Sequence, residues 1–353
     1  SNCWGGRFTI RKPFRSALDL GAGGGVQAML AARHCREVWA VDQCARAIEF
    51  ARFNLALNGI ANIHLASGDM FEPVAGRRFD LITGNLPFVI SPGRRYFYRD
   101  SGSHLDAFAR RTVSEAARRL EDGGYCHLIC QWVEIRGEDW QKRLAEWFDD
   151  TGCDAWVLQA DSWHPLTYAE NWIRDSEPDT PGHAERLFQE WARYYAEAGV
   201  ASIHTGLIAL RRSSGRNWVH IDEISGEIPA AAGDLVLRGF ALCDFENTAT
   251  DEALLATRLR LAPGAVLVSQ SRPRDDTWRP IASQIRQAEG WRLAANIDSN
   301  AAALLARCDG RRTLSEAIAS LAAAAGAPPE RIAPACLPLV RHMLRRAFLL
   351  PPG

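Results

Sequence analysis

Short apolar runs alternate with longer amphipathic segments through the first half of the 353-residue chain. The apolar runs predict strands at residues 17–20, 38–42, 63–66, 79–83, 125–132 and 155–158. The segments between them predict helices at about 26–33, 45–57, 103–121 and 138–150. Asn58-Gly59 ends the second of these helices, and Gly123-Gly124 ends the third. Alternating strands and helices predict a doubly wound, Rossmann-like α/β domain with helices on both faces of a parallel sheet.

The pattern changes twice in the second half of the chain. Residues 163–199 are acidic and aromatic and predict a mostly helical insertion, after which residues 202–211 alternate as a seventh strand. Beyond Gly215 come glycine and alanine runs, and then a capping box, Thr313-Leu314-Ser315-Glu316, begins a helix that ends at Gly326. A second basic helix to about Arg346 and a strand at 348–350 follow. We predict two domains, residues 1–214 and a smaller, winged-helix-like domain at 215–353.

Composition places the chain among globular proteins of the cytoplasm. Hydrophobic residues make up 47% and charged residues 24% of the sequence. No apolar run approaches the ~20 residues that span a bilayer, so no membrane association is expected. Residues 1–7 lack the basic start and apolar core of a signal peptide. Nine cysteines without a CxxC pair are typical of free thiols in a reducing compartment, and nine histidines without HxxxH or HxH spacing predict no zinc site.

The formal net charge of −1 argues against a protein that coats nucleic acid by charge alone. The charge is nevertheless uneven along the chain. Residues 94–119 and residues 307–346 each hold seven arginines against three acids, whereas residues 134–197 hold fifteen acids against six bases. Solvated helix faces explain most charge runs of this kind, and contact with a macromolecule is the second interpretation.

A glycine-rich turn, Asp19-Leu20-Gly21-Ala22-Gly23-Gly24-Gly25, follows the first predicted strand. Ligands of open α/β sheets bind beyond the carboxyl ends of the strands, and glycines let the backbone pass close beneath a ligand. Asp42 ends the second strand, 23 positions after Asp19, where its carboxylate can accept two hydrogen bonds from ribose hydroxyls. We assign Gln43 to the same site. The glycine-rich turn and the acid at the end of the second strand together predict a cofactor that contains adenosine.

Asp69 lies just past the third strand, followed by Met70 and Phe71. Its carboxylate can accept a hydrogen bond from an adenine amino group, with Met70 and Phe71 as walls for the base. A turn aspartate that satisfies local backbone is the alternative for this residue. The predicted cofactor-binding residues are Asp19, Gly21, Ala22, Gly23, Gly25, Asp42, Gln43, Asp69, Met70 and Asn85.

A nicotinamide cofactor is the main competitor, because its binding fold shares the turn and the acid. Its fingerprint requires a glycine three positions after the second glycine of the turn. Counting from Gly21 and Gly23 that position is Val26, and counting from Gly23 and Gly25 it is Ala28. The spacing disfavours a nicotinamide site and leaves it open as an alternative.

Asn85-Leu86-Pro87-Phe88 follows the fourth strand and resembles the Asn-Pro-Pro-aromatic motif of amino-methyltransferases. That group includes release-factor glutamine methyltransferases and enzymes that methylate adenine or guanine nitrogens. The resemblance extends over about residues 9–212. More narrowly, residues 85–92, 98–102, 137–140 and 151–156 are similar to a bacterial methyltransferase family related to the release-factor enzymes. The resemblance implies a seven-stranded class I methyltransferase sheet with S-adenosyl-L-methionine (SAM) as cofactor.

In that bacterial family an extra N-terminal domain precedes the first strand, whereas Ser1 here lies only 16 residues before Ala17. We therefore expect part of the substrate site to be missing from this chain. Residues 164–168 of the insertion are candidates to border the part of the substrate cleft that remains.

The chemistry of methyl transfer explains the motif. An amide or exocyclic amine is a weak nucleophile because its lone pair is delocalised. If Asn85 Oδ1 and the carbonyl of Leu86 accept both N–H bonds, the lone pair can point at the sulfonium methyl, and most of the rate comes from proximity and orientation. Pro87 shapes the loop, and Phe88 would stack on a planar substrate group. Leu86 stands where proline is usual, which removes stiffness from the loop.

The sequence therefore predicts an N-methyltransferase acting on a planar amide or amine of a macromolecule, either a protein such as a translation factor or an RNA. The predicted catalytic residues are Asn85, Leu86, Pro87 and Phe88. A catalytically silent SAM-binding scaffold and a nicotinamide-dependent oxidoreductase are the alternatives. The oligomeric state is left open.

Overall fold

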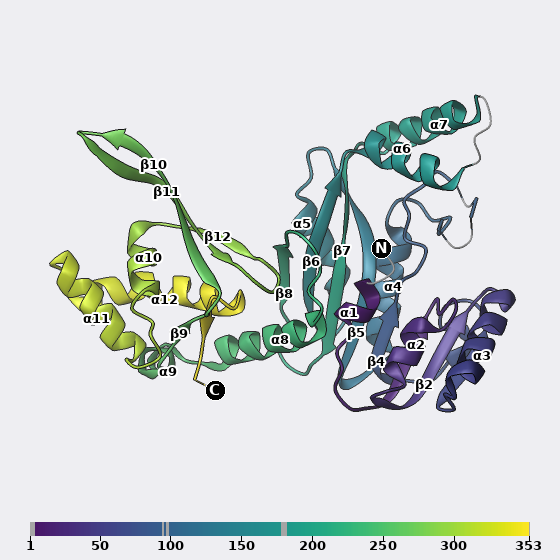
Figure 1. Ribbon diagram of the computed structural model, residues 1–353, viewed down its shortest axis with the longest axis horizontal. Helices are drawn as coiled ribbons and strands as arrows, with labels where there is room; N and C mark the ends of the chain where they lie inside the picture. Colours follow the sequence, from purple (N-terminus) through teal and green to yellow (C-terminus); the bar gives the residue numbers. More distant parts are fainter. Residues whose placement is uncertain (1–3, 94, 97–98, 178–181, 353) are drawn as a thin grey trace. The chain divides into compact units, whose positions relative to one another are not determined.

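The computed structural model describes residues 4–93, 95–96, 99–177 and 182–352 (Figure 1). By their internal contacts, the residues divide into two compact units, Ser1–Ile224 and Ser225–Gly353. The boundary therefore comes ten residues after the sequence-based boundary at residue 214, because one further strand of the first unit lies between them.

The first unit is built on an eight-stranded sheet in the order β3-β2-β1-β4-β5-β7-β6-β8 (Figure 1). All neighbouring strands pair in parallel except β7, which is antiparallel to both β5 and β6. The strand order reverses between β1 and β4, so a crevice opens there at the carboxyl edge. The strands are β1 (Phe14–Leu20), β2 (Cys35–Asp42), β3 (Ile63–Ser67), β4 (Phe79–Gly84), β5 (Leu120–Ile135), β6 (Cys153–Trp163), β7 (Val200–Arg212) and β8 (Val219–Glu223).

The Rossmann-like α/β class expected from the sequence is confirmed, with one strand more than the seven predicted. The eighth strand, β8, pairs in parallel with β6 at the edge of the sheet. It was missed because it lies beyond Gly215, where the glycine and alanine runs indicated the end of the sheet. The helices of the unit are α1 (Trp4–Phe8), α2 (Val26–Ala31), α3 (Ala45–Asn58), α4 (Ala107–Arg118), α5 (Trp140–Ala145), α6 (Pro165–Ser176) and α7 (His183–Glu197), with short 3₁₀ helices at Glu72–Val74 and Glu146–Phe148.

One predicted helix end is wrong. Helix α4 ends at Arg118, and β5 already begins at Leu120, so Gly123-Gly124 lies inside the strand and stops no helix. A side chain at Gly124 would place its Cβ 2.8 Å from the carbonyl oxygen of Glu121 and 3.0 Å from that of Phe79. The glycine pair therefore lets β5 bend close to β4, where the pairing register shifts.

The core of the first unit lies between the sheet and α4. Phe108, Val113 and Ala116 on α4 are buried, and Trp132 on β5 is fully buried. They belong to one continuous apolar cluster that also holds Leu20 from β1 and Leu86 from the loop after β4. Burial of each large apolar side chain contributes about 1.5–3 kcal/mol. The cluster therefore ties the loops at the carboxyl edge to the sheet beneath them.

The second unit combines helices with two small sheets. Strands β10 (Ala265–Arg274), β11 (Thr277–Gln287) and β12 (Ala294–Ile297) form one sheet, and β9 (Arg260–Leu261) pairs with β13 (Leu349–Leu350) in the other. Its helices are α8 (Ala232–Thr248), α9 (Asp251–Ala256), α10 (Ser299–Leu305), α11 (Leu314–Ala325) and α12 (Pro329–Arg345).

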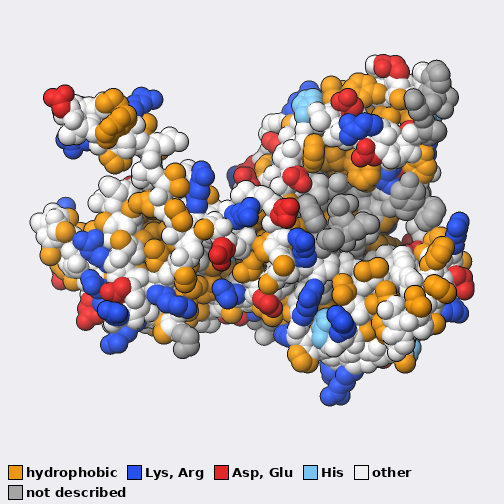
Figure 2. Space-filling view, viewed as in Figure 1, with side chains coloured by type: hydrophobic (Ala, Val, Ile, Leu, Met, Phe, Trp, Pro, Cys, Tyr) orange, Lys and Arg blue, Asp and Glu red, His pale blue; other side chains and the backbone are white. Residues whose placement is uncertain are grey.

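The predicted capping box before α11 is present, with Thr313 and Glu316 each bonding the other's backbone. The predicted second helix and terminal strand are present as α12 and β13. The hairpin β10–β11 was not predicted. It extends beyond the helices of its unit (Figure 1), and hydrophobic side chains lie on its surface at the upper left of Figure 2.

A buried carboxyl group lies at the end of β1. Asp19 Oδ2 accepts the backbone N–H of Ala28 at 2.9 Å, and Oδ1 accepts the hydroxyl of Thr83 at 3.2 Å. Asp19 is 2% exposed. Burial raises the pKa of Asp19 from 3.8 to about 7, because loss of solvent outweighs both hydrogen bonds. Asp19 therefore links β1, α2 and β4 beneath the glycine-rich turn.

The raised pKa of Asp19 predicts a pH-dependent stability. The folded chain binds the proton of Asp19 more tightly than the unfolded chain does. The stability that this proton contributes is therefore fully present below the ordinary pKa of 3.8 and is lost as the pH rises through about 7. The Asp19→Asn variant does not titrate, and its amide oxygen can accept the N–H of Ala28 while its NH2 group donates to the Thr83 hydroxyl oxygen. In urea unfolding, the free energy of unfolding of the wild type should fall by about 2–3 kcal/mol relative to that of this variant between about pH 5 and pH 8. If the free energies of unfolding of the two proteins change in parallel with pH, the raised pKa of Asp19 is contradicted.

Candidate active site

A cleft of about 440 Å³ opens at the carboxyl ends of β1, β2 and β4. Most of the residues predicted for the site line it: Gly21, Gly23, Asp42, Gln43, Asp69, Met70, Asn85, Leu86 and Pro87. Predicted residues that do not line it are Asp19, Ala22, Gly25 and Phe88. The topology therefore gathers segments that lie up to 90 positions apart in the sequence, from Gly21 to Arg111, around one cleft.

Asp42 is held at the end of β2 by backbone donors on both sides. Its Oδ2 accepts the N–H of Gly23 at 2.9 Å, and its Oδ1 accepts the N–H of Cys44 at 2.8 Å. Each carboxylate oxygen can accept a second hydrogen bond. Asp42 is thus oriented before any ligand arrives, with acceptor capacity left toward the cleft that it lines.

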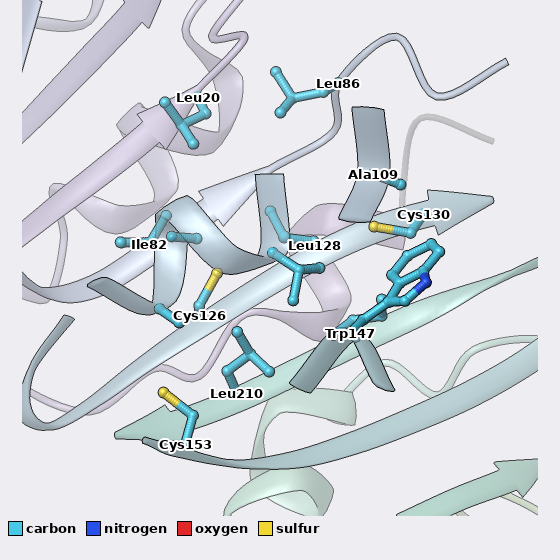
Figure 3. Close-up of a cluster of buried hydrophobic side chains, with 14 of the residues drawn as sticks. Leu20, Ile82, Leu86, Ala109, Cys126, Leu128, Cys130, Trp147, Cys153 and Leu210 are labelled. Atoms are coloured by element: carbon cyan, nitrogen blue, oxygen red, sulfur yellow. The ribbon is translucent and has the colours of Figure 1, made fainter. Parts of the chain in front are cut away.

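Gly21 and Leu86 bring the glycine-rich turn and the loop after β4 into contact. Gly21 has a φ of +66°, and a Cβ at this position would lie 2.7 Å from Leu86 Cδ2. Leu86 is only 9% exposed and belongs to the buried cluster that Figure 3 draws with Leu20 and Leu128. The stiffness that a proline would supply at residue 86 is therefore supplied by packing, because Leu86 fills the space above Gly21.

Asp69 and Met70 follow β3 at the rim of the cleft. Asp69 is exposed, and among the described residues no hydrogen-bond donor contacts its carboxylate. Met70 adopts a left-handed backbone conformation with a φ of 46°. Phe71 was expected to wall the base, and this prediction is wrong: it is 3% exposed and lies in the core. The turn at Met70 directs the next side chain inward.

Asn85 is exposed at the mouth of the cleft, directly after β4. Within the part of the chain that the structure describes, its side-chain amide has no hydrogen-bond partner. The carbonyl oxygen of Leu86 accepts the N–H of Phe88 at 2.8 Å, which leaves one lone pair of that oxygen for a ligand. Asn85 and Leu86 therefore present two acceptors side by side at the cleft.

Phe88 does not face the cleft, contrary to the prediction that it stacks on substrate. Its side chain is 7% exposed and lies 5.7 Å from the ring of Phe108, measured between centroids. The tight turn closed by the Leu86–Phe88 hydrogen bond reverses the chain and turns Phe88 into the core. Phe108, from α4, lines the cleft in its place.

The insertion holds the segment that follows this loop. The N–H of Ile90 donates to the hydroxyl of Tyr168 on α6 at 3.2 Å, and the carbonyl of Ile90 accepts the hydroxyl of Tyr195 on α7 at 2.7 Å. Burial raises the pKa of both tyrosines, which keeps their hydroxyls protonated. Helices α6 and α7 thus position the chain just beyond Phe88.

A buried ion pair continues this support toward the cleft. Asp100 accepts hydrogen bonds from the Ser91 hydroxyl at 3.0 Å, the Tyr96 N–H at 2.9 Å and Arg99 Nε at 2.7 Å. The Arg99 side chain is 3% exposed and also lies 4.0 Å from the buried Glu177. Arg99, part of the basic stretch, is therefore paired inside the protein. Tyr98 and Arg94, in the same stretch, lie outside the described residues.

Two arginines that sequence reasoning did not single out line the cleft, Arg46 and Arg111. Each guanidinium lies 5.5 Å from an aromatic ring of its own helix, Phe50 and Phe108 respectively. Both arginines are exposed. They were missed because helix periodicity alone does not say which face of α3 or α4 borders a cleft. Together they give the cleft mouth positive charge.

Three further observations concern the described residues alone. They contain no cluster of three or more His, Cys, Asp or Glu side chains that could hold a metal ion. None of their helices is long and apolar enough to cross a membrane. Their eight cysteines are all free thiols, seven of them buried.

Two family models match the chain. The methyltransferase small domain matches residues 8–151, which contain all the residues that line the cleft and the loop after β4. A domain of unknown function (DUF7782) matches residues 238–351, within the second unit. The first match decides against the nicotinamide alternative that the glycine spacing left open.

Curated relatives match the same N-terminal part of the chain. Ribosomal RNA small subunit methyltransferase C of Alcanivorax borkumensis is 31% identical over 33% of this chain and 34% of its own length. Release factor glutamine methyltransferases of Xylella fastidiosa and Geobacter sulfurreducens are 36% and 35% identical, over 33% and 42% of this chain and 47% and 55% of their own lengths. The chain thus spans about a third to a half of the length of these relatives.

Solved structures overlap the fold only loosely. The YcgJ protein of Bacillus subtilis covers 59% of this chain and 95% of its own, with a TM-score of 0.38 and 17% identity. A rRNA methylase of Streptococcus thermophilus covers 59% and 92%, with a TM-score of 0.33 and 15% identity. The family assignment therefore depends on the sequence matches. They show that the chain carries, within residues 8–151, a class I SAM-dependent methyltransferase domain related to the release-factor glutamine methyltransferases and to ribosomal RNA methyltransferase C.

Proposed function

We propose that this chain transfers the methyl group of SAM to a planar amide or amine nitrogen of a protein or RNA. One observation carries the proposal: the side-chain amide of Asn85 is exposed beside the Leu86 carbonyl at the mouth of the cleft, and no described residue forms a hydrogen bond with it. Two neighbouring acceptors suit a substrate group that offers two N–H bonds on one nitrogen. A glutamine side chain and the exocyclic amine of a nucleobase both have this chemistry.

The cleft fits SAM. A Cβ at Gly23 would meet no atom within 4 Å, so the backbone of the turn borders open space that a ligand can occupy. Asp42 is oriented to accept the two ribose hydroxyls, with Gln43 beside it, and the carboxylate of Asp69 has capacity for the adenine amino group. Met70 would contact the base. When bound, SAM supplies a methyl group that its sulfonium makes electrophilic.

The work of the protein is orientation. Asn85 Oδ1 and the remaining lone pair of the Leu86 carbonyl would accept the two N–H bonds and direct the nitrogen lone pair toward the methyl group. Holding reactants in such an attack geometry lowers the barrier by several kcal/mol. Pro87 restricts the backbone between the acceptors and Phe88. As the N–CH3 bond forms and the S–CH3 bond breaks, the methylated nitrogen would release its surplus proton to solvent, so the site needs no strong base.

Two further features support a macromolecular substrate. The relatives named above act, by their names, on release-factor glutamine and on ribosomal RNA. Arg46 and Arg111 also place exposed positive charge at the cleft mouth. A target carried by the ribosome or by RNA would be attracted by this charge.

Removal of the Asp42 carboxylate tests the assignment of the cofactor cleft. Asp42→Ala should weaken SAM binding at least about tenfold, because hydrogen bonds to a charged group contribute about 1.5–3 kcal/mol each. Isothermal titration with SAM measures the effect, and a melting curve checks that the variant is folded. Glu37→Ala is the matched control, since Glu37 lies on the same strand away from the cleft. Unchanged SAM affinity in Asp42→Ala would contradict the assignment of the cleft.

Removal of the Asn85 side-chain amide tests the acceptor loop. Asn85→Ala should lower methyl transfer at least about 100-fold and SAM affinity far less, because it removes a substrate acceptor and leaves Asp42 and the glycine-rich turn in place. Transfer of radiolabelled methyl groups from SAM to fractionated cell extract measures the activity. Asn58→Ala, an exposed asparagine at the end of α3, is the control.

The label also distinguishes the alternatives in this experiment. Label in one protein or in one RNA identifies the substrate class. If the wild-type protein binds SAM but labels no fraction, the chain is a SAM-binding scaffold and the proposed transfer is wrong. Equal labelling by wild type and Asn85→Ala would instead place the acceptor group elsewhere.

A further inference from the structure

We propose that the hairpin β10–β11 of the second unit binds single-stranded nucleic acid, with one face contacting phosphates and the other stacking on a base. This inference goes beyond the methyl transfer proposed above and does not depend on it. It rests on the exposure of the hairpin, the segregation of its side chains between two faces, and the absence of a carboxylate partner for Arg272 and Arg279 among the described residues.

The outer part of the hairpin has no core to support. Along β10 every residue from Val266 to Arg274 is exposed, and along β11 every residue from Thr277 to Ala282 is exposed. The third strand, β12, pairs only with residues 283–286 at the base. Protein stability therefore does not explain the choice of side chains beyond that point. Exposed hydrophobic side chains that gather on one hairpin indicate an interaction surface.

The pairing register separates two kinds of side chain. Arg272 lies opposite Arg279, and Pro273 lies opposite Trp278. Because side chains alternate along a strand, the two pairs point to opposite faces of the ribbon. Arg274 joins the arginine face. Pro280, which the register places opposite Ser271, joins the face of Trp278.

The arginine face carries positive charge that the protein does not neutralise. No carboxylate of the described residues lies within 4.0 Å of Arg272 or Arg279, and the only ion pair of Arg274 is with the equally exposed Asp275 at 3.9 Å. Like charges directly opposite each other destabilise a strand pair. A bound phosphate would remove this repulsion, and an arginine fork matches its oxygens.

The opposite face offers an aromatic platform. Trp278 is 72% exposed, and Pro273 and Pro280 flank it. Every nucleobase presents a planar face to such a ring, so stacking tolerates any sequence. Stacking is possible only where the base is not enclosed in a duplex, which makes a single strand the fitting ligand.

A peptide that adds a strand to the hairpin fits less well. Pro273 and Pro280 lack the N–H group that strand addition uses, and the register shifts between Gln270 and Ser271. Prolines and bulges are typical of edges that are protected from further strand pairing. We therefore expect the hairpin to bind its ligand through the side chains of its two faces and not through its backbone edge.

Fluorescence anisotropy with a labelled RNA of about 20 nucleotides tests the proposal on the full chain, without SAM. Trp278→Ala should weaken binding about tenfold, and Trp278→Phe should retain most of the affinity, since a ring remains for stacking. Arg272→Gln with Arg279→Gln should reduce the slope of log affinity against log salt by about 1.4, the value for two lost phosphate contacts. Because these residues have no core contacts, the variants should keep the wild-type melting temperature.

Matched controls come from the first unit. Arg33→Gln with Arg36→Gln removes two exposed arginines at the amino end of β2, and Phe53→Ala removes an aromatic ring that is 64% exposed. Both should bind as wild type does. Tighter binding of single-stranded RNA or DNA than of duplex, lost only in the hairpin variants, supports the proposal. It is overturned if wild type binds no strand below ~100 μM, if duplex is preferred, if the hairpin variants bind normally, or if the hairpin retains a protein ligand and no nucleic acid.

Discussion

The contact between Leu86 and Gly21 joins the two halves of the candidate active site. The glycine-rich turn after β1 and the loop after β4 lie side by side because these two strands are parallel neighbours in the sheet, with their carboxyl ends at the same edge. Leu86 fills the space that a side chain at Gly21 would occupy, and it is anchored in the core below. The spacing between the glycine-rich turn and the loop after β4 is therefore set by packing. Interiors are too dense for such a contact to shift freely.

Polar groups then restrain the loop from the opposite side. Two buried tyrosine hydroxyls bond both the N–H and the carbonyl of Ile90, and the buried Asp100 gathers backbone and side-chain donors from the segment that follows. A buried polar group that loses its partner is costly, so these bonds favour one loop conformation. The insertion α6–α7 thus supports the segment just after Phe88 and forms no part of the cleft, which residues 164–168 do not line.

The two units present positive charge in different ways. In the first unit, Arg99 of the basic stretch is buried in ion pairs, whereas Arg46 and Arg111 are exposed at the cleft. In the second unit, the arginines of the hairpin lie on a ribbon without core contacts. The count of charges along the sequence placed Arg99 and Arg111 together in the basic stretch 94–119 and singled out neither Arg46 nor the hairpin arginines. Burial and pairing separate those that build structure from those that are free to meet a ligand.

Local patterns of the sequence were sufficient to identify groups that line the cleft. The turn at Gly21, the acid at Asp42, Asp69 after β3 and Asn85 after β4 all reach it. The capping box at Thr313 is likewise a local signal. Such features depend on residues a few positions apart, so periodicity and turn chemistry reveal them. Tertiary structure alone decided that Phe71 and Phe88 turn inward, that Tyr168 and Tyr195 hold Ile90, and that β10–β11 is an exposed hairpin. Those outcomes depend on contacts between segments as many as 105 residues apart and on which faces remain uncovered, and neither is encoded in the spacing of neighbouring residues.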